Sequence, residues 1–266
     1  MKKFKCICES ITYLIIFSVT IIATAFITSL IYILFGYFNI SLPTISPDLL
    51  EIIACLLMIL VFFLLFKRKK ISFRSSIHLK KIKPISMLMF ILCGISLLFI
   101  CTVVLSYLIH FFDFKGYASN VTTESLAGVN LLWFFLAKSV AAPIGEEITF
   151  RGLIYPKLKK GYSKAFSSFL SSLIFGLLHL SSAVYTVITA FLLGVLNNYL
   201  SEKYNSILPG ILIHSGFNFM SAFGQLYFRN LGASEVPINI TLFIILIIST
   251  IYIVLDIRKI KKVDII

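Results

Sequence analysis

The chain has 266 residues, of which 59% are hydrophobic and only 13% are charged. Soluble domains usually carry about 45–50% apolar and roughly 25% charged residues, so this balance excludes a disordered chain and argues strongly against a soluble domain. The 24 Lys and Arg residues against 11 Asp and Glu give a formal net charge of +13, which indicates either binding of a polyanion or orientation of a protein in a membrane.

Apolar runs follow one another along the chain, and a helix of about 20 apolar residues spans the hydrocarbon core of a bilayer. The first run follows two lysines as a signal peptide would, but it is too long for one and lacks a clear cleavage site, so we expect a retained helix. We predict an all-α, polytopic membrane bundle of about eight transmembrane helices. They are expected at residues 11–38, 49–66, 85–112, 130–152, 164–180, 183–200, 207–223 and 238–256. No repeat or linker divides the chain, so residues 1–266 are predicted to form a single integral membrane domain.

The Lys and Arg residues fall mainly on one side of the predicted bundle. With the N-terminus inside, most of them lie in inner segments, whereas only Lys115 and Arg229 lie in outer ones. Cytoplasmic loops of membrane proteins collect Lys and Arg, so this asymmetry predicts that both termini are cytoplasmic. The basic segment 67–83 would attract anionic headgroups of the lipid bilayer. No nucleic-acid-binding motif accompanies it, so we expect no nucleic-acid partner.

The fourth predicted helix carries Glu146, Glu147 and Arg151. A charge near the middle of a bilayer costs at least about 2.5–3.5 kcal/mol, so ionisable residues there are functional candidates. Glu147 and Arg151 are four residues apart with the acid first, so they are expected to neutralise each other. Glu146 points about 100° away and has no local partner, which suits a general base. The alternative is that all three side chains are solvated at the cytoplasmic interface.

Two histidines lie on other predicted helices. His179 shares a helix face with Phe175, and His214 shares one with Asn218, because each pair is four residues apart. Small residues around them, such as Gly216, would let neighbouring helices approach closely. Counting the helical rise from the inner edge places His214 at roughly 11 Å and His179 at roughly 23 Å. The two can meet only if the helices tilt or begin deeper than predicted.

Other polar residues in the predicted helices have simpler interpretations. Asn197 and Asn198 either join a site or hydrogen-bond a neighbouring helix, and we favour the hydrogen bond. Lys138 is expected to line its helix or to extend toward the interface.

Three motifs occur in order on separate predicted helices. They are Glu-Glu-x-x-x-Arg at residues 146–151, Phe-x-x-x-His at 175–179 and His-x-x-x-Asn at 214–218. Together they resemble the CPBP intramembrane protease family, also called the Abi or CAAX-protease-and-bacteriocin-processing family. The resemblance implies a catalytic core over about residues 130–223.

The resemblance also implies an intramembrane CAAX-type endopeptidase with a defined set of catalytic residues. Glu146 and His179 would activate a water molecule, while His214 and Asn218 would stabilise the oxyanion. Glu147 and Arg151, the second glutamate and the arginine of the first motif, would support these catalytic residues. This division is chemically coherent, since a general base creates the nucleophile and hydrogen-bond donors meet the charge that develops in the tetrahedral intermediate.

The need for a metal stays open at this point. Two histidines and a carboxylate match a catalytic zinc site in residue type, so a divalent metal such as zinc is one candidate cofactor. However, the chain has no His-Glu-x-x-His helix, and the ligands would come from three distant helices. We favour the metal-free mechanism.

The expected substrate is a peptide or protein at the membrane. Eukaryotic members of the family cleave the last three residues from prenylated Cys-a-a-X proteins, whereas bacterial members are associated with peptide processing or bacteriocin self-immunity. The Ile-, Lys- and Asn-rich composition favours a bacterial origin and hence a multi-pass protein of the plasma membrane. The main alternative is a bacteriocin immunity or binding protein with little or no catalysis. A transporter with a Glu/His proton relay is a weaker alternative, because the chain lacks paired, interrupted helices in two matching halves.

Overall fold

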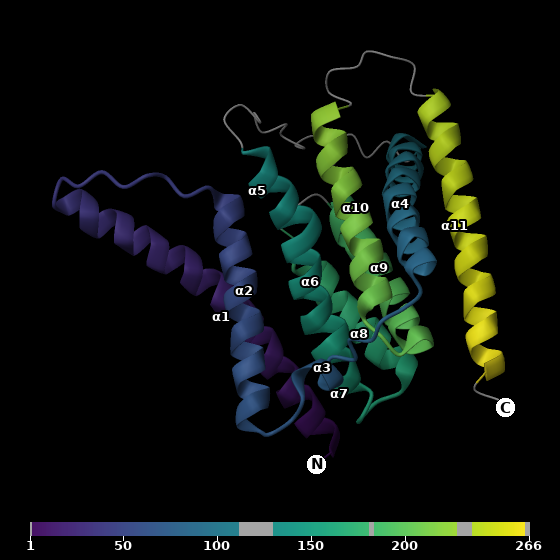
Figure 1. Ribbon diagram of the computed structural model, residues 1–266, viewed down its shortest axis with the longest axis horizontal. Helices are drawn as coiled ribbons and strands as arrows, with labels where there is room; N and C mark the ends of the chain where they lie inside the picture. Colours follow the sequence, from purple (N-terminus) through teal and green to yellow (C-terminus); the bar gives the residue numbers. More distant parts are fainter. Residues whose placement is uncertain (1, 112–129, 181–183, 228–235, 264–266) are drawn as a thin grey trace.

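The computed structural model describes residues 2–111, 130–180, 184–227 and 236–263, and these residues form helices and connecting turns without a β-strand (Figure 1). Helix α11 lies at one edge of the view, α1 and α2 lie toward the other, and α6, α8, α9 and α10 lie between them. The elements are α1 (Lys2–Tyr37), α2 (Pro47–Arg68), α3 (Phe73–Ser76), α4 (Pro84–Phe111), α5 (Leu131–Leu136), η1 (Ala137–Ala141), α6 (Ala142–Glu147), η2 (Ile148–Ile154), α7 (Tyr155–Leu158), α8 (Lys164–Leu177), α9 (Val184–Tyr204), α10 (Leu208–Tyr227) and α11 (Val236–Val263).

The predicted all-α membrane bundle is confirmed. Each predicted apolar segment corresponds to a helix or to a continuous helical run, although some ends differ clearly: the first helix begins at Lys2 instead of residue 11, and the last ends at Val263 instead of residue 256. Within the described residues, four helical stretches are long and apolar enough to cross a bilayer, at Lys2–Tyr37, Pro47–Arg68, Pro84–Cys101 and Ile240–Ile260. The number of eight spans and the cytoplasmic position of both termini stay predictions.

The fourth predicted helix is one helical run, but two parts of it, η1 and η2, are π-helical. A proline removes one backbone hydrogen bond and its ring clashes with the carbonyl four residues earlier. Pro143 stands four residues after Ser139 of η1, and Pro156 stands four residues after Gly152 of η2. Widening the preceding turn lets the run continue past each proline to Leu158. The helix therefore does not break at Pro156, and it carries its polar residues between two widened turns.

Helices α4 and α10 pack extensively because small residues let their backbones meet. A Cβ atom on Gly94 of α4 would lie 2.1 Å from the carbonyl oxygen of Ile213. A Cβ atom on Gly216 of α10 would lie 2.3 Å from the carbonyl oxygen of Ile91. The close approach predicted around Gly216 is thus present. It fixes the rotation of α10 about its axis and therefore the direction in which His214, two residues earlier, points.

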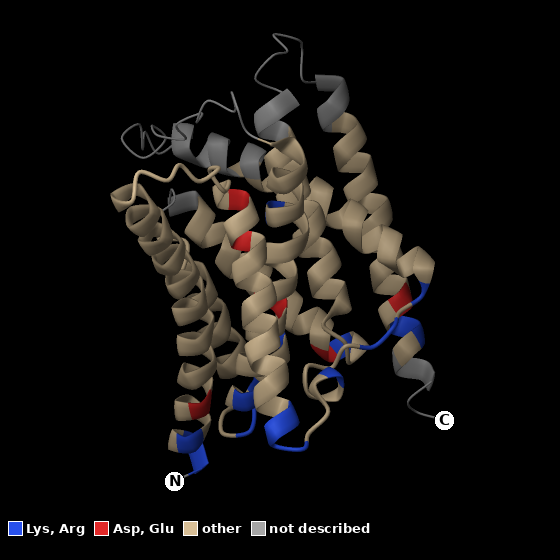
Figure 2. Cartoon of the chain, turned by 60° about the vertical axis from the view of Figure 1, so that its left-hand side comes forward, with Lys and Arg blue, Asp and Glu red and all other residues tan. Residues whose placement is uncertain are grey.

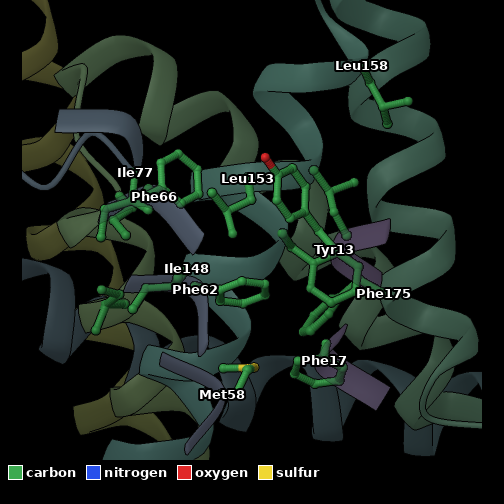
Figure 3. Packing of buried hydrophobic residues seen from close by; sticks show 14 of the residues in the cluster. Tyr13, Phe17, Met58, Phe62, Phe66, Ile77, Ile148, Leu153, Leu158 and Phe175 are labelled. Atoms are coloured by element: carbon green, nitrogen blue, oxygen red, sulfur yellow. The ribbon is translucent and has the colours of Figure 1, made fainter. Parts of the chain in front are cut away.

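A hydrophobic cluster joins α1 and α2 to the run from α6 to α8 (Figure 3). Phe62, Phe150 and Phe175 are almost completely buried in it. The ring centroids of Phe17 and Phe150 are 6.1 Å apart, and those of Phe150 and Phe175 are 5.1 Å apart. This row of rings runs from α1 to the end of α8 and supports the polar residues described below.

The segment between α2 and α4 folds over the turn that joins α9 to α10. The Ser206 hydroxyl donates to the Lys80 carbonyl at 2.8 Å, and the Lys80 amide donates to the Ser206 hydroxyl at 3.2 Å. The Ile207 amide donates to the His78 carbonyl at 3.1 Å. Since Ser206 and Ile207 are buried under this segment, α10 begins inside the bundle rather than at its surface.

Basic residues gather toward the end of the bundle where both termini lie (Figure 2). Several are paired there: Lys159 and Lys164 contact Glu202, and Lys157 lies 2.8 Å from Glu9. This distribution is the one expected if the basic surplus orients the bundle in a membrane. The two cations predicted on the outer side, at positions 115 and 229, lie outside the described residues.

Candidate active site

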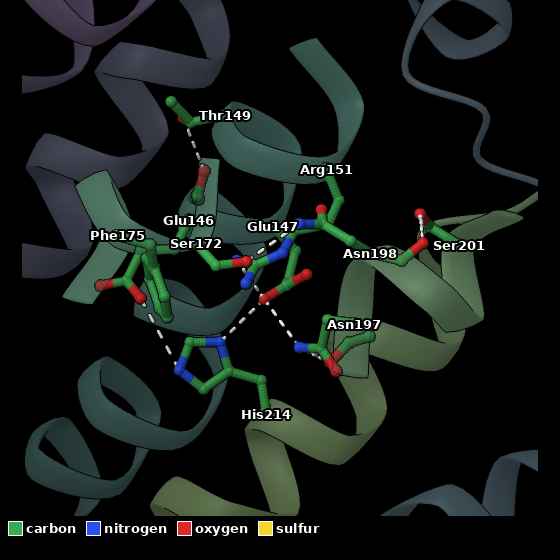
Figure 4. Close-up of polar contacts among 12 residues, drawn as sticks. Glu146, Glu147, Thr149, Arg151, Ser172, Phe175, Asn197, Asn198, Ser201 and His214 are labelled. Atoms are coloured by element: carbon green, nitrogen blue, oxygen red, sulfur yellow. Dashed lines mark hydrogen bonds and ion pairs between the residues drawn. The ribbon is translucent and has the colours of Figure 1, made fainter. Parts of the chain in front are cut away.

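Glu147 is the centre of a buried polar cluster (Figure 4). Its side chain is fully buried, and its Oε1 atom meets donors from three helical segments. Arg151 Nη1 and Asn197 Nδ2 each donate to it at 3.0 Å, and His214 Nδ1 lies 3.1 Å away. The predicted ion pair between Glu147 and Arg151 is therefore present. The alternative that these side chains are solvated at the interface is wrong, because their exposed fractions are 0% and 1%.

His214 lies between the two adjacent glutamates. Its Nδ1 atom faces Glu147, and its Nε2 atom lies 3.6 Å from Glu146 Oε2. Because Nδ1 contacts an acceptor that already binds Arg151, we assign the hydrogen to Nδ1. Glu146 itself is 20% exposed, in contrast to its sealed neighbour. Two consecutive acids thus have different surroundings and share one imidazole.

Phe175 brings the second histidine to this cluster. Its ring centroid lies 5.1 Å from that of His179 and 5.7 Å from that of His214, and the Arg151 guanidinium lies 4.5 Å from the same centroid. His179 Nδ1 is 2.9 Å from the carbonyl oxygen of Phe175. With the hydrogen on Nδ1, the Nε2 atom is left as an acceptor.

The two histidines therefore converge, although the helical rise predicted different depths for them. Counting from the membrane edge was wrong for His214, because α10 does not begin at the edge that the count assumed, whereas α8 begins at Lys164 as predicted. Helix α10 begins at a buried turn beneath the segment that carries His78, and His179 follows the end of α8 instead of lying within it.

Asn218 lies one helical turn beyond His214 on α10. Its Nδ2 atom donates to the carbonyl oxygen of Lys138 at 2.9 Å, which ties α10 to η1 of the run that carries Glu146. The Lys138 ammonium pairs with Glu51 of α2 at 2.5 Å. The Lys138 side chain is thus neutralised by an ion pair with α2, while its backbone carbonyl contacts α10.

Two hollows open beside Glu146. One, of about 320 Å³, lies between α1, α2 and α6 and is also lined by Glu51 and Cys55. The other, of about 300 Å³, lies between α1 and the end of α8 and is also lined by His179. Phe17 of α1 lines both. The Glu146 carboxylate is therefore reachable from two mainly apolar spaces, whereas Glu147 lines neither.

The two consecutive asparagines of α9 have different partners. Asn198 donates to Ser168 and Ser172 of α8, which is the helix–helix contact that the sequence favoured. Asn197 instead donates to Glu147 and to the carbonyl oxygen of Gly210, at 3.0 Å and 3.3 Å, so it joins the cluster. None of the three motifs contains it. A carboxamide in a helix otherwise rich in apolar residues is the sequence signal that could have identified it, and the structure shows it fully buried.

The arrangement of these groups does not fit a metal site, although their residue types match one. Among the described residues, no three His, Cys, Asp or Glu side chains are grouped so that they could hold a metal ion. His214 presents its two ring nitrogens to carboxylates, and His179 directs Nδ1 to a backbone carbonyl.

Comparison with known families identifies the segment that carries the cluster. Residues 128–220 match the family described as type II CAAX prenyl endopeptidase Rce1-like. The match includes all three motifs and confirms the resemblance to the CAAX protease family that they indicated. A search of the curated proteins and a search of the solved structures each found no match. The family match, together with the long apolar helices, supports a membrane-embedded protease as the general class.

Proposed function

We propose that the chain is an intramembrane endopeptidase that hydrolyses a peptide bond of a membrane-associated peptide or protein with water activated by Glu146. One observation carries the proposal: of two adjacent acids that share His214, one is sealed by three donors and the other lines two hollows. The fully buried Glu147 is suited to hold neighbouring side chains in position, and the accessible Glu146 is suited to act on a water molecule.

The mechanism requires a carboxylate at Glu146, which serves as the base. Glu146, Glu147 and Arg151 together carry one net negative charge when all are ionised. A second hydrogen on the His214 imidazole, which the mechanism uses at Nε2, makes the cluster neutral as a whole, and a neutral cluster is the less costly one in a membrane interior.

Glu146 and His179 line the same hollow and are suited to hold the attacking water between them. The hydrogen bond from His179 Nδ1 to the Phe175 carbonyl leaves Nε2 as an acceptor for one water hydrogen. The Glu146 carboxylate accepts the other hydrogen as the water oxygen attacks the carbonyl carbon. The proton then passes from Glu146 to the amide nitrogen as the C–N bond breaks, which yields a carboxylic acid and an amine.

The protonated His214 would stabilise the oxyanion of the tetrahedral intermediate through Nε2, with Asn218 as a second donor. Removing one preorganised donor of this kind costs about 2.7–4 kcal/mol of transition-state stabilisation in other hydrolases. Phe175 acts as a positioning residue, since its ring contacts both histidines and the Arg151 guanidinium.

The substrate would enter from the membrane. Both hollows beside Glu146 have linings that are mainly apolar, and α1, which borders both, exposes many large apolar side chains. These features suit a peptide segment that is itself apolar or held at the bilayer. We place the activity in a bacterial plasma membrane on the basis of composition.

A single substitution tests the proposal. The full chain is purified in lipid nanodiscs and assayed with a fluorescence-quenched peptide that carries a prenylated cysteine near its C-terminus. Glu146→Gln keeps the shape of the side chain and removes the base, so kcat should fall at least about 100-fold, within the usual contribution of acid–base catalysis. Glu51→Gln is the matched control, because Glu51 lines the same hollow but takes no part in the chemistry. Its kcat should stay within about threefold of the wild type.

Two further measurements complete the test. A chelator should leave the activity unchanged, since no step uses a metal. Proteomics of membrane fractions should find peptide termini that appear with the wild type and disappear with Glu146→Gln. Equal turnover by the wild type and Glu146→Gln would refute the role of Glu146. A wild type that cleaves neither the peptide nor any membrane protein would refute the proposed function and favour a binding protein.

A further inference from the structure

A hollow of about 600 Å³ opens at the basic end of the bundle, and the proposed hydrolysis does not use it. It is formed by α3, by the segment from α3 to α4 and by the α9–α10 turn. Its lining includes Arg74, His78, Lys80, Lys81 and Asn205, together with serine hydroxyls, and it includes no carboxylate. The hollow is therefore a concentration of positive charge with hydrogen-bond donors on its wall.

The cations of this hollow differ from neighbouring ones in having no acidic partner. Lys83 pairs with Asp256 and Lys159 contacts Glu202. In contrast, Arg74, Lys80 and Lys81 form no ion pair with a carboxylate among the described residues. Like charges held close together repel, and an anion bound between them would remove that repulsion.

The wall of the hollow is held in place by backbone contacts. The Lys80 backbone exchanges two hydrogen bonds with Ser206, and the His78 carbonyl accepts from the Ile207 amide. Arg74 Nε donates to the Leu79 carbonyl at 3.3 Å. A preorganised set of donors loses less conformational entropy when it binds a ligand than a mobile one does.

The position of the hollow indicates the source of the anion. It lies between the end of α2 and the start of α4, where two membrane-length helices reach the same end of the bundle. Ile71, on the same connecting segment, is 50% exposed and would contact lipid. A bilayer crossed by these two helices would have its headgroup phosphates near the level of the hollow, and anionic lipids concentrate beside basic segments.

We propose that this hollow is a phosphate-binding site that holds the headgroup phosphate of an anionic lipid in the adjacent leaflet. Arg74, Lys80 and Lys81 supply the charge, and Asn205 with the serine hydroxyls supplies neutral donors. Free phosphate has the same chemistry, so the experiment includes one arm for each source. The site is independent of the proposed peptidase activity, because no residue of the Glu147 cluster lines it.

His78 provides a reporter inside the site. Burial lowers the pKa of His78 below its usual value, and the ammonium groups of Lys159, Lys80 and Lys160 lower it further, while a hydrogen bond with Asn205 acts in the opposite direction. A bound phosphate would bring negative charge to the imidazole. It should therefore raise this pKa toward or above the ordinary value for histidine.

The experiment compares two double variants of the full chain. Lys80→Gln/Lys81→Gln removes two cations of the hollow and leaves the backbone contacts of Lys80 in place. Lys67→Gln/Lys69→Gln removes two cations from the same end of the bundle that do not line it. Each is titrated with inorganic phosphate in detergent, and each is reconstituted in nanodiscs of phosphatidylglycerol or phosphatidylcholine. Retained lipid is measured by native mass spectrometry, and the His78 pKa is measured by NMR with His78→Gln for assignment.

At physiological ionic strength, charges more than about 8 Å from a ligand are largely screened, so only the cations of the hollow should matter strongly. We expect the first double variant to weaken phosphatidylglycerol retention at least tenfold and the second to weaken it less than threefold. The wild-type His78 pKa should rise in phosphatidylglycerol relative to phosphatidylcholine. A loss of binding that is confined to Lys80→Gln/Lys81→Gln and is seen only in nanodiscs supports a lipid as the source of the phosphate. The same loss in nanodiscs and in the titration with inorganic phosphate supports a phosphate site open to either source. Equal loss in the two double variants, an effect of free phosphate alone, or an unchanged His78 pKa would overturn the proposal.

Discussion

Replacing Glu147 by glutamine tests whether charge holds the buried cluster together. The substitution keeps the size of the side chain but removes the negative charge that Arg151 faces at 3.0 Å. Arg151 is 1% exposed, so it cannot turn its guanidinium to water without a rearrangement of the bundle. Glu147→Gln should therefore leave a buried cation without compensation.

The expected loss follows from these contacts. Removing one partner of a buried ion pair destabilises a protein by about 3–5 kcal/mol, because the remaining charge stays buried. Asn197 and His214 donate to the same oxygen, and a glutamine carbonyl keeps part of those two hydrogen bonds. We therefore expect a loss of about 3–5 kcal/mol in the free energy of unfolding.

The assay is unfolding of the purified chain in mixed micelles by increasing mole fractions of dodecyl sulfate, followed by circular dichroism. Glu51→Gln is the control, because Glu51 also pairs with a lysine but is 31% exposed, and it should lose about 0–1 kcal/mol. The double variant Glu147→Gln/Arg151→Met removes both charges and should recover at least half of the loss. The reasoning fails if Glu147→Gln is no less stable than Glu51→Gln, or if removing Arg151 as well makes the protein still less stable.

Two further predictions concern packing between helices. Gly94→Ala should destabilise the bundle by about 1–3 kcal/mol in the same unfolding assay, because its Cβ would lie 2.1 Å from the Ile213 carbonyl oxygen. Gly36→Ala is the control, since a Cβ there meets no atom within 4 Å and should cause no such loss. Equal effects of the two substitutions would contradict the prediction. Asp256→Asn should lower the free energy of unfolding by about 1–3 kcal/mol, because this carboxylate accepts hydrogen bonds from α4, from α9 and from the lysine just before α4. Unchanged unfolding would show that these contacts do not hold α11 in place.

Local features of the site were predictable from the sequence. Spacing by four residues put Glu147 beside Arg151 and Phe175 beside His179, and both contacts are present. The helices were predictable from hydropathy for the same reason, since a membrane span depends on a continuous apolar stretch of the chain itself. Small residues such as Gly216 indicated close packing without naming the helix they contact.

Features that depend on distant parts of the chain were not predictable in this way. The depth of His214 depends on the turn that begins α10, and that turn is covered by a segment more than 100 residues earlier in the chain. Asn197 belongs to no motif, and its contact with Glu147 requires the relative position of α9 and α6. Helical spacing also assumes one regular helix, whereas η1 and η2 widen the run that carries Glu146.

The contacts within the cluster support the proposal that the chemistry takes place at Glu146. Buried ion pairs are weak sources of stability, and well-packed apolar residues of similar volume often serve as well or better. A bundle selected for stability alone would have no need of two adjacent carboxylates, a guanidinium and an imidazole in its interior. Arg151 and Asn197 hold Glu147, Glu147 holds His214 through Nδ1, and His214 directs Nε2 to Glu146. Each contact in this series restrains the next, and the series ends at the acid that lines both hollows, which is where the proposed hydrolysis would take place.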